Sequence, residues 1–242
     1  KVLRENQKLK VMKKLIVVLI SVVSLSATAQ DNPKYLNVMA VNGLNMRSQP
    51  DAKSRVVTKV AYGNKVEIME KSKVQLQLGW VSDHWYKVAY RGREGFIFGG
   101  YLSGYAAPKL QKTQKLSDLL PLYCTKTYTM AGNPVLTTEV IGHDTLKLQL
   151  VKFKNGAELE LENSRDRSQA TLIIPGSVQD AYVFLEALLK SNESEELLDE
   201  LRFIRGKDGL LSRVNNANET ISIKSFDDGL TVIKLTDFFT TN

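Results

Sequence analysis

Cys124 and His143 are the two residues whose types could form a thiol nucleophile with a base, as in a cysteine peptidase. A reactive thiolate usually needs an electropositive setting, such as a helix N-terminus, that lowers the thiol pKa. Cys124 instead lies in residues 122–128, whose aromatic and threonine-rich composition predicts a β-strand. We therefore interpret Cys124 as a small buried core residue. The sequence predicts that the protein is not an enzyme; a thiol hydrolase is the least favoured function.

The sequence does not indicate a metal site, a phosphate-binding loop or a serine nucleophile either. His84 and His143 fall in different predicted domains, and their surroundings do not match zinc-ligand spacing. Glu158, Glu160 and Glu162 alternate along a predicted strand and could together attract a cation or a basic partner. A solvated sheet face explains this row as well, and we favour it because exposed carboxylates are common. No catalytic residues, metal ligands or cofactor are predicted.

The elements that would position a binding site are short β-strands between residues 44 and 102. Val66 and Ile68 alternate with polar residues, as do the apolar positions of residues 86–90, which is the pattern of half-buried strands. Turn-forming residues recur about every ten positions, as short-stranded sandwiches and barrels require. So few residues cannot form two large sheets, and a closed barrel also removes exposed strand edges. The sequence therefore predicts a small β-barrel.

Several motifs in this stretch occur in the order typical of a known family. They are residues 44–50 (LNMRSQP), 62–68 (YGNKVEI), 85–88 (WYKV) and 95–102 (GFIFGGYL). The stretch resembles a bacterial SH3 (SH3b) domain, which implies a binding module for peptidoglycan peptides or other cell-envelope components. Two departures are Gln49, where the family most often has glycine, and a longer connection over residues 71–84, which we expect to alter the ligand surface.

The predicted barrel is rich in aromatic residues, and a barrel this small cannot bury them all. Exposed rings offer apolar contact area with little loss of entropy. Alternation places Tyr86 and Tyr90 on one face of their strand and Trp85 on the other. The candidate ligand-binding residues are Tyr62, Trp80, Trp85 and Tyr101; for Trp85 a core position is the stronger alternative.

Residues 116–242 predict an antiparallel sheet with two helices. An Asn155-Gly156 turn would pair Leu150 with Leu161 and collect the leucines on one face, with the glutamates on the other. A three-residue loop at 227–229 would set Ile223 against Ile233 and Ile221 against Leu235. Ser177 and Asp180 indicate a capping box for a helix over 178–190, and a second helix is predicted after Asn192, closing near Gly206. The overall fold class is α+β.

The N-terminal segment has the pattern of a cleaved secretory signal. Lys13 and Lys14 precede an apolar run over 15–25 and a small-residue site, so residues 1–29 form the signal region, with translation starting at Met12. Removing residues 1–29 lowers the formal net charge from +7 to +2, which removes the case for nucleic-acid binding. The run is too short for a membrane-spanning helix, so we expect no stable membrane anchor after cleavage.

The predicted organisation is a signal region (1–29), an SH3b-like barrel (34–103), a linker (104–115) and an α+β domain (116–242). The leading hypothesis is an exported, periplasmic or secreted, non-catalytic protein that binds a cell-wall peptide or another envelope component. The alternative is a protein–protein interaction scaffold, homo-oligomeric through its α+β half and without cell-wall binding.

Overall fold

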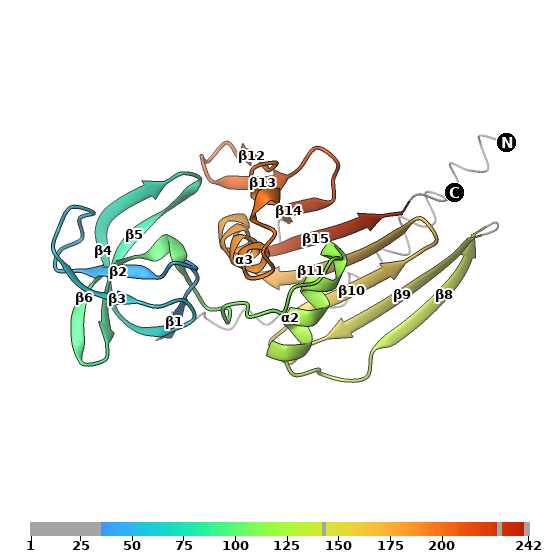
Figure 1. Ribbon diagram of the computed structural model, residues 1–242, viewed down its shortest axis with the longest axis horizontal. Coiled ribbons are helices and arrows are strands. Elements are labelled where there is room, and N and C mark those ends of the chain that lie inside the picture. Colours follow the sequence, from blue (N-terminus) through green and yellow to red (C-terminus); the bar gives the residue numbers. More distant parts are fainter. Residues whose placement is uncertain (1–34, 142–143, 227–228, 240–242) are drawn as a thin grey trace. The chain divides into compact units, whose positions relative to one another are not determined.

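The computed structural model describes residues 35–141, 144–226 and 229–239 (Figure 1). The predicted signal region lies outside the described residues, as do His143 and Asp227. Within the described residues, no helix combines the length and the apolar character that crossing a bilayer requires.

The first half is a curled antiparallel sheet whose strands follow the order β3-β2-β6-β5-β4-β1-β7. Its interior is made of small and branched apolar side chains that alternate along short strands, as the sequence predicts. The strands are β1 (Tyr35–Val38), β2 (Leu44–Arg47), β3 (Val56–Val60), β4 (Lys65–Leu78), β5 (Val81–Tyr90), β6 (Arg93–Phe98) and β7 (Leu102–Ser103), with a 3₁₀ turn, η1 (Gly99–Tyr101), before β7.

The long connection over residues 71–84 is an extended β-hairpin. β4 and β5 pair to their ends, so that Leu78 lies opposite Val81 and the tip is Gly79-Trp80. Gly79 has a φ of +58°, a conformation that glycine adopts without steric cost. Register shifts after Ile68 and Lys71 bend the hairpin. The extra residues therefore carry Trp80 away from the barrel's interior.

Side chains on the two faces of β5 are buried in two different apolar clusters. Val88 lies in the barrel interior, and Tyr86 and Tyr90 pack against that cluster from the same face. Trp85, on the other face, belongs to a second and larger cluster that includes residues of the C-terminal half. This split confirms the predicted alternation of Trp85 with Tyr86 and Tyr90. It also means that the outer wall of the barrel is a packing surface.

The second half is an eight-stranded antiparallel sheet in the order β12-β13-β14-β15-β11-β10-β9-β8. Helices α2 (Leu119–Thr127) and α3 (Val178–Ser191) pack on the sheet (Figure 1). The apolar side chains between the helices and the sheet form the larger core. The α+β class predicted for the chain agrees with this arrangement. The strands are β8 (Val135–Ile141), β9 (Asp144–Lys152), β10 (Glu158–Asn163), β11 (Arg167–Pro175), β12 (Arg202–Arg205), β13 (Leu211–Asn215), β14 (Ile221–Ser225) and β15 (Leu230–Phe238).

The register predicted for the β9–β10 hairpin is wrong by one residue. Leu150 faces Glu160, and Leu161 faces Gln149. The loop has three residues rather than two, because the Phe153 N–H donates to the Ala157 carbonyl at 2.9 Å and Gly156 adopts a φ of +83°. This register buries Val151, Phe153 and Leu159 under the helices and leaves Leu148 and Leu150 on the opposite face with the glutamates.

The register predicted for the C-terminal hairpin is confirmed. Ile223 pairs with Ile233, and Ile221 pairs with Leu235. All four side chains are buried. Gly229, the last residue of the predicted loop, has a φ of +79°.

One of the two predicted helices is confirmed, and the other is wrong. α3 begins with the predicted capping box, in which the Ser177 hydroxyl accepts from the Asp180 N–H and the Asp180 carboxylate accepts from the Ser177 N–H. After Asn192 there is only a 3₁₀ turn, η3 (Glu195–Leu198), followed by strand β12. The alternation of β12 lets Phe203 pack against Tyr182 of α3, a contact that outweighs local helix propensity.

The strand predicted around Cys124 is instead helix α2. Pro121 lies in the first turn of this helix, where a missing backbone N–H costs nothing. Leu119, Leu120, Tyr123 and Cys124 are its buried side chains. The prediction that Cys124 is a buried core residue is confirmed, whereas its predicted secondary structure is wrong.

Candidate binding surface

Trp80 is the predicted ring that reaches the surface. It occupies the tip of the β4–β5 hairpin and keeps 42% of its surface exposed. Its ring stacks on Phe203 of β12, with 4.7 Å between centroids and 10° between planes. Phe203 in turn meets the edge of Tyr182, with centroids 5.1 Å apart. The C-terminal half therefore holds the indole in one orientation while part of the ring stays open to a ligand.

A cation lies beside this indole. The Arg205 guanidinium is 5.4 Å from the centroid of the Trp80 ring, within the range of cation–π attraction. Its Nη1 donates to the Gly209 carbonyl at 2.8 Å, which fixes the side chain. Arginine presents several donors in a planar fork that suits carboxylates. Trp80 and Arg205 together could contact an apolar group and an acidic group of the same ligand.

The hairpin is also tied to helix α3 by a reciprocal pair of hydrogen bonds. The Ser82 N–H donates to Gln179 Oε1 at 2.8 Å, and Gln179 Nε2 donates to the Ser82 carbonyl at 3.1 Å. These bonds satisfy the backbone of a residue two positions from Trp80. They limit rotation of the hairpin tip relative to the C-terminal half.

Trp85 is a core residue, with 4% of its surface exposed. Its ring meets the edge of Phe98 at a centroid distance of 6.4 Å, within the larger cluster. A ligand at the surface would not reach it without displacing other side chains. Its role in this structure is to join the barrel wall to the common core.

Tyr62 is half-buried and holds down the segment that follows the barrel. Its hydroxyl donates to the Pro108 carbonyl at 2.6 Å, and burial raises the pKa of the phenol. Tyr105, further back in the same segment, donates to the Pro175 carbonyl, and its ring packs against Phe184. The residues predicted to form a linker are therefore attached to both halves.

Tyr101 lines a small hollow of about 160 Å³ between residues 39–42 and helix α3. Burial, followed by the charge of Glu186, raises the pKa of Tyr101 to about 12. Glu186 Oε1 accepts from Lys190 at 2.5 Å. The volume is well below the roughly 300–1,000 Å³ typical of small-molecule sites, so the hollow has room for little more than one side chain.

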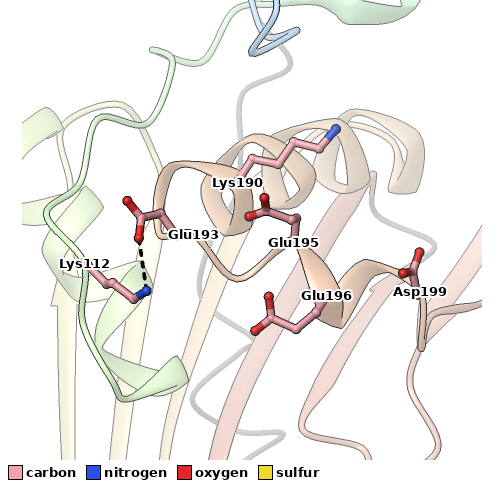
Figure 2. A pocket seen from close by; sticks show the side chains of 6 residues that line it. All are labelled: Lys112, Lys190, Glu193, Glu195, Glu196 and Asp199. Atoms are coloured by element: carbon pink, nitrogen blue, oxygen red, sulfur yellow. Dashed lines mark hydrogen bonds and ion pairs between the residues drawn. The ribbon is translucent and has the colours of Figure 1, made fainter.

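A larger, open hollow lies where α3 ends, with a volume of about 720 Å³ (Figure 2). Figure 2 shows Lys112 reaching Glu193, and the two ions are 3.0 Å apart. The lining is entirely charged, without aromatic or aliphatic side chains, and consists of Lys112, Lys190, Glu193, Glu195, Glu196 and Asp199. Among the residues that the structure describes, no cluster of histidine, cysteine and carboxylate groups is arranged to hold a metal ion. This hollow is best described as an open, solvated depression of the surface.

The glutamate row of β10 is largely neutralised by neighbouring cations. Glu158 pairs with Lys152 at 2.9 Å, and Glu162 pairs with Arg167. Burial raises the pKa of Glu160, helped by repulsion from the two flanking glutamates. The row faces away from the helices, which is the solvated-face arrangement favoured by the sequence.

Two local contacts fix the backbone of the barrel at its turns. Arg47 Nη1 donates to the Ser54 carbonyl at 2.6 Å and closes the turn after β2. At Gly100 a Cβ atom would lie 2.5 Å from Val81 Cγ1, so this position in η1 requires glycine. Residues 42–103 match the family model of the bacterial SH3 domain.

This segment is a bacterial SH3 domain.

The match ends where β7 ends, and no family is assigned to the rest of the chain. Searches of curated proteins and of solved structures found no match. The bacterial SH3 domain is therefore the part of the chain from which function can be argued. Its candidate contact residue, Trp80, lies at the tip of the β4–β5 hairpin.

Sequence reasoning missed the partners that the C-terminal half supplies. Phe203 and Arg205 lie more than 120 positions from Trp80, and their strand was predicted as a helix. The spacing of Phe203 and Arg205 at every second position was the one local signal of a strand there. Nothing in the sequence pairs that strand with the hairpin.

Proposed function

We propose that the protein is an exported, non-catalytic binding protein whose bacterial SH3 domain recognises a cell-wall peptide or another envelope component. The family of residues 42–103 supports a binding role. The signal-like pattern of residues 13–29 supports export. The observation on which the site depends is the exposed indole of Trp80, held on Phe203 and flanked by Arg205.

The chemistry of this surface suits an extended peptide. A ring held in place contributes apolar area without losing much entropy on binding. The Arg205 fork can receive a carboxylate, either at a peptide terminus or on an acidic side chain. The ligand would lie along the hairpin tip and strand β12, so both halves of the chain would contribute to its recognition.

Cell-wall binding can be tested with purified sacculi and the chain from Gln30 onward, which contains every residue that the structure describes. We expect Trp80→Ala to weaken binding by about 2 kcal/mol, roughly thirtyfold in affinity, as for an aromatic hot spot. Trp80→Phe, which can still stack on Phe203, should lose less. Co-sedimentation over a range of sacculus concentrations measures both effects.

Phe226 offers a matched control for this experiment. It is 49% exposed, and Lys224 lies 4.9 Å from its ring centroid, so it combines an open ring with a cation outside the SH3 segment. Phe226→Ala should bind like the unchanged protein. Equal losses in both variants, or no binding by the unchanged protein, would refute the assignment of the site.

A second candidate function is a protein–protein interaction scaffold. The observation that favours it lies outside the barrel, in the exposed apolar side chains of strand β8. Light scattering together with the sacculus assay separates the two functions: a stable oligomer that is indifferent to cell wall supports the scaffold.

A further inference from the structure

Strand β8 forms an open edge of the eight-stranded sheet. Among the described residues, β9 is the one strand paired with it. β8 has seven residues, no proline, and Glu139 as its single charge. An edge strand of this kind presents a row of backbone donors and acceptors to other chains.

The opposite edge of the same sheet shows how such pairing is usually avoided. β12 has four residues, carries Arg202 and Arg205, and shifts register between Ile204 and Arg205. Short length, positive charge and a bulge each discourage edge-to-edge pairing. β8 has none of these three features.

Two apolar side chains of β8, Leu136 and Val140, are exposed and lack apolar partners across their own hairpin. Leu136 is 74% exposed and lies opposite Gln149; Val140 is 75% exposed and lies opposite Thr145. Both lie on the face of the sheet that carries the core, because Gln149 pairs onward with Leu161. A second apolar strand alongside β8 would cover them.

The sequence of β8, VLTTEVI, is complementary to itself when it runs antiparallel about Thr138. Leu136 then lies opposite Val140 of the second strand, and Thr137 lies opposite Glu139. Each pair occurs twice because of the twofold symmetry. Cross-strand pairs of branched apolar residues stabilise a sheet, and a threonine hydroxyl can donate to a carboxylate.

Neighbouring registers are worse. Centring the pair on Glu139 would place two like charges directly opposite each other, which is destabilising. Centring it on Thr137 would set Leu136 against Thr138 and lose both apolar pairs. The charge pattern of β8 therefore selects one alignment.

We propose that two copies of the chain associate through β8, antiparallel and centred on Thr138, to form one continuous sheet across the dimer. This inference does not depend on what the SH3 domain binds. A single pair of seven-residue strands makes a small interface, so the dimer should be weak and visible in a concentration series.

The first test is the molar mass of the chain from Gln30 onward by sedimentation equilibrium, up to about 1 mM. We expect a monomer–dimer equilibrium that Leu136→Lys or Val140→Lys shifts to monomer. Both positions are exposed, so folding should be unaffected. Leu210→Lys is the matched control, since Leu210 is 67% exposed away from this edge, and it should leave the equilibrium unchanged.

The second test addresses the register. Thr137→Lys would face Glu139 of the other copy twice and should tighten the dimer, whereas Thr137→Glu should weaken it, each by roughly 2- to 30-fold. Non-specific association would not respond in opposite directions. A monomer at every concentration, an oligomer insensitive to the lysine variants, or equal effects of the two Thr137 variants would each overturn the proposal. Because sacculus binding is measured separately, failure here leaves the SH3 assignment standing.

Discussion

Cys124 illustrates how the position of one side chain determines its chemistry. It lies within α2 with no exposed surface, and burial raises the pKa of its thiol to about 12. A nucleophile needs the opposite shift. The sequence indicated a core cysteine correctly, because free cysteine is commonly buried. It could not indicate the helix, since five of the seven residues at 122–128 are tyrosine, cysteine or threonine, which are poor helix formers, and tertiary packing holds the helix in place.

The raised pKa predicts an unreactive thiol and a stability that falls at alkaline pH. Below about pH 9 the thiol is protonated in both folded and unfolded chains. Between about 9 and 12 the unfolded chain loses its proton while the folded chain keeps it, so stability falls with rising pH. We expect native protein at pH 8 to resist a thiol reagent that modifies the urea-unfolded chain. Urea unfolding at pH 8 and 10.5 checks the second effect.

Cys124→Ala is the control for this prediction, because it removes the titrating group. Its stability should fall less between the two pH values than that of the unchanged protein. Buried tyrosines such as Tyr101 contribute to the same decline, so some pH dependence should persist. Rapid labelling of the folded protein at pH 8 would contradict the burial of Cys124.

At the scale of elements, local signals predicted structure well where turn chemistry and pattern were both decisive. The C-terminal hairpin and the capping box of α3 are of this kind. The register of the β9–β10 hairpin was predicted wrongly because Asn155-Gly156 fits both a two-residue and a three-residue loop. The choice between them depends on whether Phe153 or Leu150 packs under the helices, and that is a tertiary contact. The Phe153 ring packs against Tyr128, in the chain segment after α2, with 5.4 Å between the ring centroids.

The capping box gives a prediction for α3. Ser177→Ala removes the acceptor for the Asp180 N–H and should lower the free energy of unfolding by about 1 kcal/mol. Ser82→Ala is a suitable control, since Ser82 is exposed and contacts Gln179 through its backbone. Urea unfolding followed by circular dichroism measures both variants. A loss in Ser82→Ala as large as that in Ser177→Ala would refute the capping contribution.

At the scale of the whole molecule, the barrel and the C-terminal half share one apolar core. Val81, Trp85 and Phe98 lie in the same cluster as the buried side chains of α3. The division into a barrel, a linker and an α+β domain stays a prediction, and composition cannot reveal that a barrel's outer wall is buried. The candidate site has the same limit: Trp80 was identified, and its partners on β12 were not.

A shared core predicts that the two halves unfold together. Both tryptophans lie in the barrel half where it contacts the C-terminal half, so fluorescence reports on the barrel and on this contact, whereas circular dichroism at 222 nm reports mainly on α2 and α3. We expect coincident urea midpoints, as a single cooperative transition requires. Phe203→Ala, which removes the stacking partner of Trp80, should lower both midpoints. Separate midpoints in the unchanged protein would show that the halves are independent.

The burial of Trp85 and Phe98 against the C-terminal half has a practical consequence for anyone who wishes to study the SH3 segment in isolation. A fragment that ends at residue 103 would expose one apolar patch to water, made of Met39, Val81, Trp85 and Phe98. Such a fragment should self-associate or adsorb to surfaces non-specifically. Any apparent ligand would reflect the newly exposed apolar surface rather than the domain.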